Sequence, residues 1–168
     1  MSNVRRQVRI PGHIVPFWQL FARSQPEDPT SRFFEAFHFD DNESSANELA
    51  QLVLAGKKRA TAGLAWAFEA ASAPLPKAGD LSVVTDWAKK PLCVIETLRV
   101  DIVAYDEVSE EFAATEGEGD GSLQYWRQVH WASFERRCRR LGRAPELKMP
   151  VACERFKVIF RGQPENDA

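Results

Sequence analysis

Strand-like and helix-like patterns follow one another along this chain without regular alternation, and this order limits the folds open to it. Helical periodicity occurs at residues 45–56 and 122–142, and β-branched or alternating runs occur at 81–85, 92–100, 101–105 and 151–160. No glycine-rich nucleotide fingerprint follows a strand, so a Rossmann fold is not expected. The order favours an α+β domain, built as a small β-barrel of strongly bent sheet flanked by helices.

Length and composition favour one compact domain. The chain has 168 residues, of which 44% are hydrophobic, enough for an ordinary core. Charged residues make up 27% and the net charge is only -2, which excludes a wholesale polyanion binder and a disordered acidic chain. Any nucleic-acid binding must therefore use local patches.

The cysteines and the apolar runs indicate a cytoplasmic protein. Cys93, Cys138 and Cys153 are odd in number and far apart, which argues against a disulfide framework and against a zinc site. No apolar signal core follows the basic N-terminus, and no run approaches the ~18 apolar residues of a membrane helix. We expect no membrane association, and the sequence leaves open whether the protein is a monomer or a dimer.

Three segments are expected along the chain. Residues 1–40 would form a basic arm, a short helix beginning near Pro16 and a strand, all packing on the domain. Residues 41–162 would form the domain itself, and residues 163–168 a polar tail.

Several element boundaries can be predicted within the domain. Ser45 and Glu48 have the spacing of a capping box for a helix that ends at Gly56. Residues 61–68 are rich in small and aromatic residues and are expected to form a strand. Ser122 is expected to cap the longest helix.

The segment Gly56-Lys57-Lys58-Arg59-Ala60-Thr61 places an amine and a hydroxyl three positions apart at a helix-to-strand junction. Positive charge on Lys57 and Arg59 would favour a neutral Lys58 amine, which could accept a proton. Thr61 would then be the nucleophile. The alternative is that the basic residues complement a helix C-terminus and that Thr61 simply begins a strand.

The segment Glu116-Gly117-Glu118-Gly119-Asp120-Gly121-Ser122 brings three carboxylates together ahead of the longest helix. Glu118 could act as an acid or base if burial or neighbouring carboxylates raise its pKa. The alternative, preferred for Glu116 and Asp120, is that these acids solvate a loop and favour the helix N-terminus. We expect the Lys58 ammonium and the Glu118 carboxylate to point into the same hollow.

No metal site is expected, with magnesium at the acidic loop as the remaining alternative. Counting from Glu116, the twelfth position is Arg127, where a calcium-binding EF-hand loop needs a glutamate. His13, His38 and His130 are scattered, and His130 lies on the apolar stripe of the longest helix. We interpret His130 as a packed, hydrogen-bonded histidine.

Basic and aromatic residues suggest contact with nucleic acid. Five arginines crowd the end of the longest helix: Arg136, Arg137, Arg139, Arg140 and Arg143. Together with the basic junction they could follow a phosphate backbone, although arginines at a helix C-terminus need no partner. Trp66, Tyr125 and Trp131 are candidate stacking platforms for a base, and core packing is the alternative for each.

Three motifs in this order resemble the ASCH domain, a small β-barrel family related to the PUA-like RNA-binding folds. They are Gly56-x-Lys58-x-x-Thr61 after a helix, the Gly79-Asp80 turn before a strand, and Glu116-Gly117-Glu118-Gly119-Asp120 ahead of a helix. The resemblance implies a cleft on the barrel that binds RNA or a nucleoside, without a cofactor.

Some bacterial members of that family are amidohydrolases of acetylated cytidine, and the resemblance then implies Lys58, Thr61 and Glu118 as catalytic residues. We place Lys57, Arg59, Trp66, Ser122 and Tyr125 around them as substrate-binding residues. Other members are implicated as ribonucleases that use the same lysine. A noncatalytic RNA-binding or regulatory module is the third possibility, and this chain is longer than the compact amidohydrolases.

Overall fold

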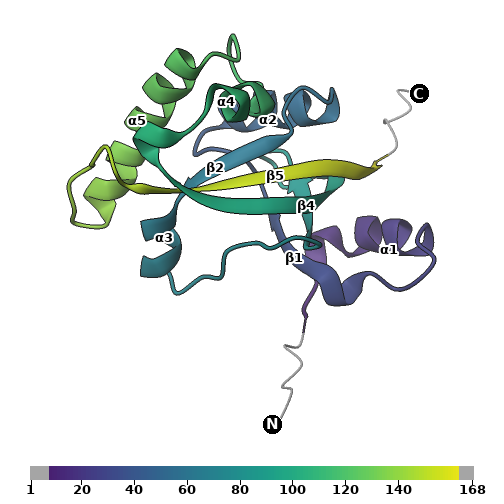
Figure 1. Ribbon diagram of the computed structural model, residues 1–168. Helices are drawn as coiled ribbons and strands as arrows, with labels where there is room; N and C mark the ends of the chain where they lie inside the picture. Colours follow the sequence, from purple (N-terminus) through teal and green to yellow (C-terminus); the bar gives the residue numbers. More distant parts are fainter. Residues whose placement is uncertain (1–7, 163–168) are drawn as a thin grey trace.

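A computed structural model of the chain describes residues 8–162, which form one five-stranded sheet with helices around it (Figure 1). The strands are β1 (Phe33–Phe37), β2 (Ala60–Leu64), β3 (Leu81–Thr85), β4 (Pro91–Ala104) and β5 (Pro150–Arg161). The α-helices are α1 (Val15–Arg23), α2 (Glu43–Leu54), α3 (Ala65–Ala70), α4 (Glu110–Glu116) and α5 (Leu123–Arg140). Short 3-10 helices lie at Gly12–Ile14, Thr30–Arg32 and Tyr105–Glu107.

The sheet is open and has β1 and β2 at its two edges. The strand order is β1-β3-β4-β5-β2, with β1 parallel to β3 and the other neighbours antiparallel. The long pairing of β4 with β5 has register shifts at Val94/Ile95 and Thr97/Arg99. Such bulges increase the local twist and bend the strands, and Figure 1 shows both strands sweeping across the molecule.

The predicted closed barrel is therefore wrong, although the α+β class is confirmed. Closing a barrel requires the two edge strands to pair with each other. Within residues 8–162, β1 pairs only with β3 and β2 only with β5. Side chains from both edges, including Phe37 and Ala62, instead line a hollow between them.

Three apolar clusters hold the helices on the sheet. One joins α1 to β3 and β4 through residues that include Phe21, Leu81 and Val94. A second places α2 against the sheet through Val53 and Phe156. The third and largest joins α4, α5 and β5 and includes Phe112, Trp126, Phe134 and Val151. Burial of each aromatic or branched side chain contributes about 1.5 to 3 kcal/mol.

Two predicted boundaries differ in the structure. Asn42, rather than a Ser45–Glu48 capping box, caps α2, because its Oδ1 accepts a hydrogen bond from the Ser45 amide at 2.9 Å. Residues 61–68 are not one strand, because β2 ends at Leu64 and the helix-favouring run Ala65–Ala70 forms α3.

Other predictions have mixed outcomes. The strands expected at 92–100 and 101–105 are one continuous strand, since β4 pairs with β5 from Cys93 to Ala104. The start of α1 beside Pro16 and the Ser122 cap of α5 are confirmed. The division at residue 41 stays a prediction, and the tail and the first seven residues of the basic arm lie outside the described residues.

No helix in the described part of the chain is both long enough and apolar enough to cross a membrane.

Gly117 holds the end of α4 against the loop before β2. Its φ is 65°, and a Cβ placed on it would lie 2.1 Å from the Lys57 carbonyl oxygen. Gly56 also has a positive φ, 75°, but a Cβ there would meet nothing within 4 Å. A side chain at Gly56 would therefore meet only backbone strain, whereas a side chain at Gly117 would meet both backbone strain and a steric clash.

We expect Gly56→Ala to lower the free energy of unfolding by about 1 kcal/mol, the cost of a left-handed alanine. Gly117→Ala should cost at least about 2 kcal/mol more, because the new methyl group collides with rigid backbone. Urea unfolding of both variants measures the difference. Equal losses would show that the loop before β2 moves aside without cost.

Candidate functional site

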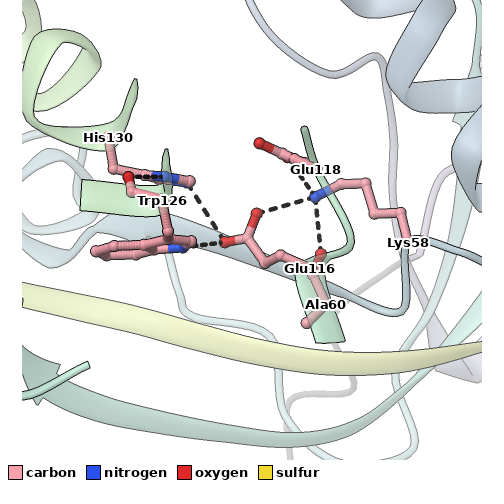
Figure 2. Close-up of polar contacts among 6 residues, drawn as sticks. All are labelled: Lys58, Ala60, Glu116, Glu118, Trp126 and His130. Atoms are coloured by element: carbon pink, nitrogen blue, oxygen red, sulfur yellow. Dashed lines mark hydrogen bonds and ion pairs between the residues drawn. The ribbon is translucent and has the colours of Figure 1, made fainter. Parts of the chain in front are cut away.

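A buried ammonium lies at the centre of a cluster of charged side chains. Lys58, in the loop between α2 and β2, is 1% exposed. Its Nζ donates to the Ala60 carbonyl oxygen at 2.8 Å, to Glu116 Oε2 at 3.1 Å and to Glu118 Oε1 at 2.7 Å (Figure 2). An ammonium has three hydrogens, so these acceptors use its full donor capacity.

Backbone contacts explain how these distant residues meet. The Arg59 amide donates to the Thr115 carbonyl at 2.9 Å, and the Arg59 carbonyl accepts from the Phe156 amide at 3.1 Å. The Lys57 carbonyl packs closely against Gly117. The Lys58 loop is thus fixed between the end of α4 and β5, with its amine directed toward Glu116 at the end of α4 and Glu118 in the loop that follows. The predicted convergence of Lys58 and Glu118 is confirmed.

Lys58 is a cation in this environment. Burial alone would lower its pKa, but the carboxylates of Glu116 and Glu118 outweigh burial and raise the pKa above its ordinary value. The side chains of Lys57 and Arg59, expected to favour a neutral amine, are exposed. Lys58 therefore has no free lone pair with which to accept a proton.

Glu116 is the buried counter-ion of this ammonium. Its Oε1 accepts from Trp126 Nε1 at 3.0 Å and lies 3.3 Å from His130 Nε2. Burial would raise the pKa of Glu116, but Lys58 and His130 hold it well below its usual range. The prediction that Glu116 solvates a loop is wrong. The sequence feature that could have predicted its burial is its position one helical turn after Phe112, on the buried face of α4.

His130 completes the far side of the cluster. Its Nδ1 donates to the Trp126 carbonyl at 2.9 Å, and its ring stacks on the Trp126 ring with centroids 4.2 Å apart. Burial would lower the pKa of His130, but Glu116 outweighs it and raises the pKa. Because Nδ1 carries a proton, Nε2 can donate to Glu116 only in the imidazolium form. The predicted packed, hydrogen-bonded histidine is confirmed.

Glu118 is the member of the cluster closest to solvent, with its side chain 14% exposed. Burial is the main cause that raises its pKa, and Glu116 adds to it against the opposing effect of Lys58. One carboxylate oxygen is bonded to Lys58, and Figure 2 shows the other turned away from that amine. Asp120, also expected to act on Glu118, is exposed and accepts a hydrogen bond from the Ser122 amide at 2.9 Å.

The cluster borders a cleft of three hollows that meet at Ala62 on the edge strand β2. The first, which we call the Glu118 hollow, has a volume of about 140 Å³ and is lined by Phe39, Thr61, Glu118 and His130, among others. The second, the arginine hollow, has about 350 Å³, and its lining includes Ser133, Arg136, Arg137 and Arg140. The third, the Glu154 hollow, has about 160 Å³, and its lining includes Glu35, Phe37, Phe68 and Glu154.

The structure separates the predicted site residues into two groups. Thr61 and Glu118 line the Glu118 hollow together, and Lys58 lies behind its carboxylate wall. The residues predicted to bind substrate are absent from the described lining of all three hollows: Lys57, Arg59, Trp66, Ser122 and Tyr125.

The aromatic residues and the serine that were predicted to contact a ligand instead make contacts within the protein. The Arg143 guanidinium lies 3.3 Å from the centre of the Trp66 ring. Ser122 accepts a hydrogen bond from the Tyr125 amide at 3.1 Å as the cap of α5. A Cβ on Gly119 would lie 2.5 Å from the Tyr125 ring, so that ring supports the acidic loop. Trp131 packs on Tyr105, with ring centroids 5.3 Å apart.

Glu116, Glu118 and His130 could offer three ligand atoms to a metal ion, since these atoms lie within 4.8 Å of one another. The Lys58 ammonium, however, already bonds an oxygen of each carboxylate. A metal ion between them would stand beside a positive charge. The arrangement therefore suits an internal ammonium better than a divalent cation.

The Lys58–Glu116 ion pair should be strongly coupled. Lys58→Met removes the cation that two carboxylates share, and Glu116→Gln removes the anion that Lys58 and His130 share, so each should lower the free energy of unfolding by about 3 to 5 kcal/mol. The double variant should lose clearly less than the sum of the two. Denaturant unfolding of the three variants tests this, with the exposed pair Arg139→Gln and Glu135→Gln as the control. Additive losses would contradict the pairing.

The contribution of His130 to stability should depend on pH. Its pKa is raised in the folded protein, so the contribution is complete below the unfolded value of about 6.5. It should disappear as the pH rises through the folded pKa. Free energies of unfolding of the wild type and His130→Gln, measured from pH 5.5 to 9, should converge toward high pH. A constant difference would mean that His130 stays neutral.

Comparisons with known proteins agree with this fold. The segment 35–160 matches the ASCH domain family. The crystal structure of an ASCH domain from Lactobacillus crispatus JV V101 is 35% identical, with a TM-score of 0.85, covering 90% of this chain and 97% of that one. A protein from Enterococcus faecalis V583 is 29% identical, with a TM-score of 0.81 and 89% of each chain covered.

A comparison with curated proteins gives no match. The family match spans most of the chain, and the first structural relative is matched over nearly its whole length. The protein therefore belongs to the ASCH domain family.

Proposed function

We propose that the protein binds a modified pyrimidine nucleoside, free or within RNA, in the Glu118 hollow and hydrolyses an amide on its base, as in acetylated cytidine. The observation that carries the proposal is the Glu118 carboxylate, whose pKa is raised and which borders a hollow that Thr61 also lines. A carboxylate that borders a hollow and whose pKa is raised suits general acid–base catalysis. Membership of the ASCH family fits an RNA-related ligand.

The lining of the Glu118 hollow suits an acylated base. Phe39 and Phe134 supply apolar walls, and Glu118 and Thr61 supply polar groups. The amide N–H of an acylated exocyclic amine can donate to a carboxylate, and the acyl oxygen can accept from a hydroxyl. Because the hollow continues into two others at Ala62, the sugar can remain outside it.

Glu118 is the proton carrier in the proposed reaction. Its carboxylate removes a proton from a water molecule as the water oxygen attacks the acyl carbonyl carbon. The Thr61 hydroxyl donates to the oxyanion that forms. Glu118 then returns the proton to the exocyclic nitrogen as the carbon–nitrogen bond breaks, giving the free amine and a carboxylic acid.

Lys58 positions Glu118 in this scheme and does not act as the base. Its three hydrogens are already donated to Ala60, Glu116 and Glu118. The same geometry weighs against a ribonuclease that uses Lys58 to stabilise phosphate charge, because the ammonium lies behind the two carboxylates. A noncatalytic RNA-binding module remains the alternative outcome of the test.

Incubation with N4-acetylcytidine, followed by chromatography of the released cytidine, tests the proposal. We expect Glu118→Gln to lower kcat/KM at least about 100-fold, since general acid–base catalysis contributes this much. Thr61→Val should lower it about 100- to 1000-fold, the cost of losing one oxyanion donor, and Thr61→Ser should keep most of the activity.

Asp120→Asn is the matched control, because it removes a carboxylate from the same loop without touching the hollow. It should react like the wild type. Binding of the nucleoside without turnover in the wild type would exclude the hydrolase and leave a binding module. Failure to bind would remove the Glu118 hollow as the site.

A further inference from the structure

One face of α5 presents a stripe of polar and basic residues to the cleft. Ser133, Arg136, Arg137 and Arg140 all line the arginine hollow. Their spacing of three, four and seven residues places them on one side of the helix. Arg136 and Ser133 also line the Glu118 hollow, so the two hollows share a wall.

The charges in the arginine hollow are only partly balanced. Asp40 and Asp41 face the three arginines, with His38 beside them. Arg140 lies 3.8 Å from Asp41, and both side chains are more than half exposed. Within residues 8–162, Arg136 and Arg137 form no ion pair. The hollow therefore retains positive charge.

A favourable interaction of the arginines with the dipole at the C-terminal end of α5 does not explain why they lie in one stripe. A basic residue anywhere around the last turn of α5 would serve the helix dipole. Arg139 instead pairs with Glu135 at 3.1 Å, and Arg143 covers Trp66. Three guanidinium groups at helical spacing repel one another, and an anion between them would relieve that repulsion.

We propose that the arginine hollow binds a phosphate group attached to the nucleoside that occupies the Glu118 hollow. This inference rests on the proposed function and specifies its substrate class as a nucleotide rather than a free nucleoside. Guanidinium groups bind phosphate oxygens through paired hydrogen bonds. The volume of about 350 Å³ leaves room for a phosphate beside the sugar.

The phosphate can belong to a mononucleotide or to the backbone of RNA, and both carry the same chemistry. Calorimetry at constant salt compares N4-acetylcytidine, its 3′- and 5′-monophosphates, and a short RNA with one internal N4-acetylcytidine. At least one phosphorylated ligand should bind about tenfold or more tightly than the nucleoside. A preference for the monophosphates identifies a nucleotide enzyme, and a preference for the oligomer identifies an RNA enzyme.

Arg137→Gln/Arg140→Gln should abolish that preference, because these side chains line only the arginine hollow. Affinity for the free nucleoside should stay unchanged. Arg139→Gln is the matched control, since it removes an arginine of the same helix that lies outside the hollow. Circular dichroism checks that all variants fold.

Equal affinity for phosphorylated and unphosphorylated ligands would overturn the inference while leaving the proposed function intact. So would a preference that survives the double change. If phosphorylated ligands bind through the arginines but Glu118→Gln hydrolyses N4-acetylcytidine like the wild type, the inference stands and the proposed role of Glu118 fails. If no ligand binds, both fail.

Discussion

The charge of a single buried ammonium organises this molecule. Lys58 comes from one loop, Glu116 ends a helix, and Glu118 follows in the next loop, yet one nitrogen bonds all three segments. Neither the Lys58 ammonium nor the Glu116 carboxylate could be buried alone, because the desolvation cost amounts to several kcal/mol per ion. The ammonium and the carboxylates must therefore be held together by the backbone. Gly117 packs on the Lys57 carbonyl, and the Arg59 backbone bonds to Thr115 and Phe156. The site and this part of the core share one set of interactions.

The cluster divides its two carboxylates into different roles. Glu116 receives Lys58, Trp126 and His130 and is stabilised as an anion. Glu118 shares the same ammonium, but its burial, together with the negative charge of Glu116, raises its pKa. Two neighbouring acids whose pKa values move in opposite directions are typical of acid–base chemistry. The outer acid is the one that borders the cleft.

Local patterns predicted much of this fold, and the contacts across the chain decided the rest. The Pro16 start, the Ser122 cap and the apolar stripe of α5 depend on neighbouring residues and are confirmed. Sheet closure depends on whether β1 reaches β2, which no local pattern encodes. The protonation of Lys58 was misjudged because its sequence neighbours, Lys57 and Arg59, point to solvent, whereas its spatial neighbours are acids 58 and 60 positions away. The importance of Glu116 was missed because its helix is only seven residues long.

The open edge of β2 has a consequence for ligand recognition. Within residues 8–162, β2 pairs with β5 on one side only, so alternate peptide groups along the strand have no partner strand, and Thr61 and Ala62 of this strand line the Glu118 hollow. A peptide N–H can donate to the N3 or O2 acceptor of a cytosine-type base, and a peptide C=O can accept from its exocyclic N–H. Main-chain reading of a base would survive any side-chain replacement along this strand. Selectivity of that kind belongs to the fold itself, and it would be shared by chains whose cleft side chains differ.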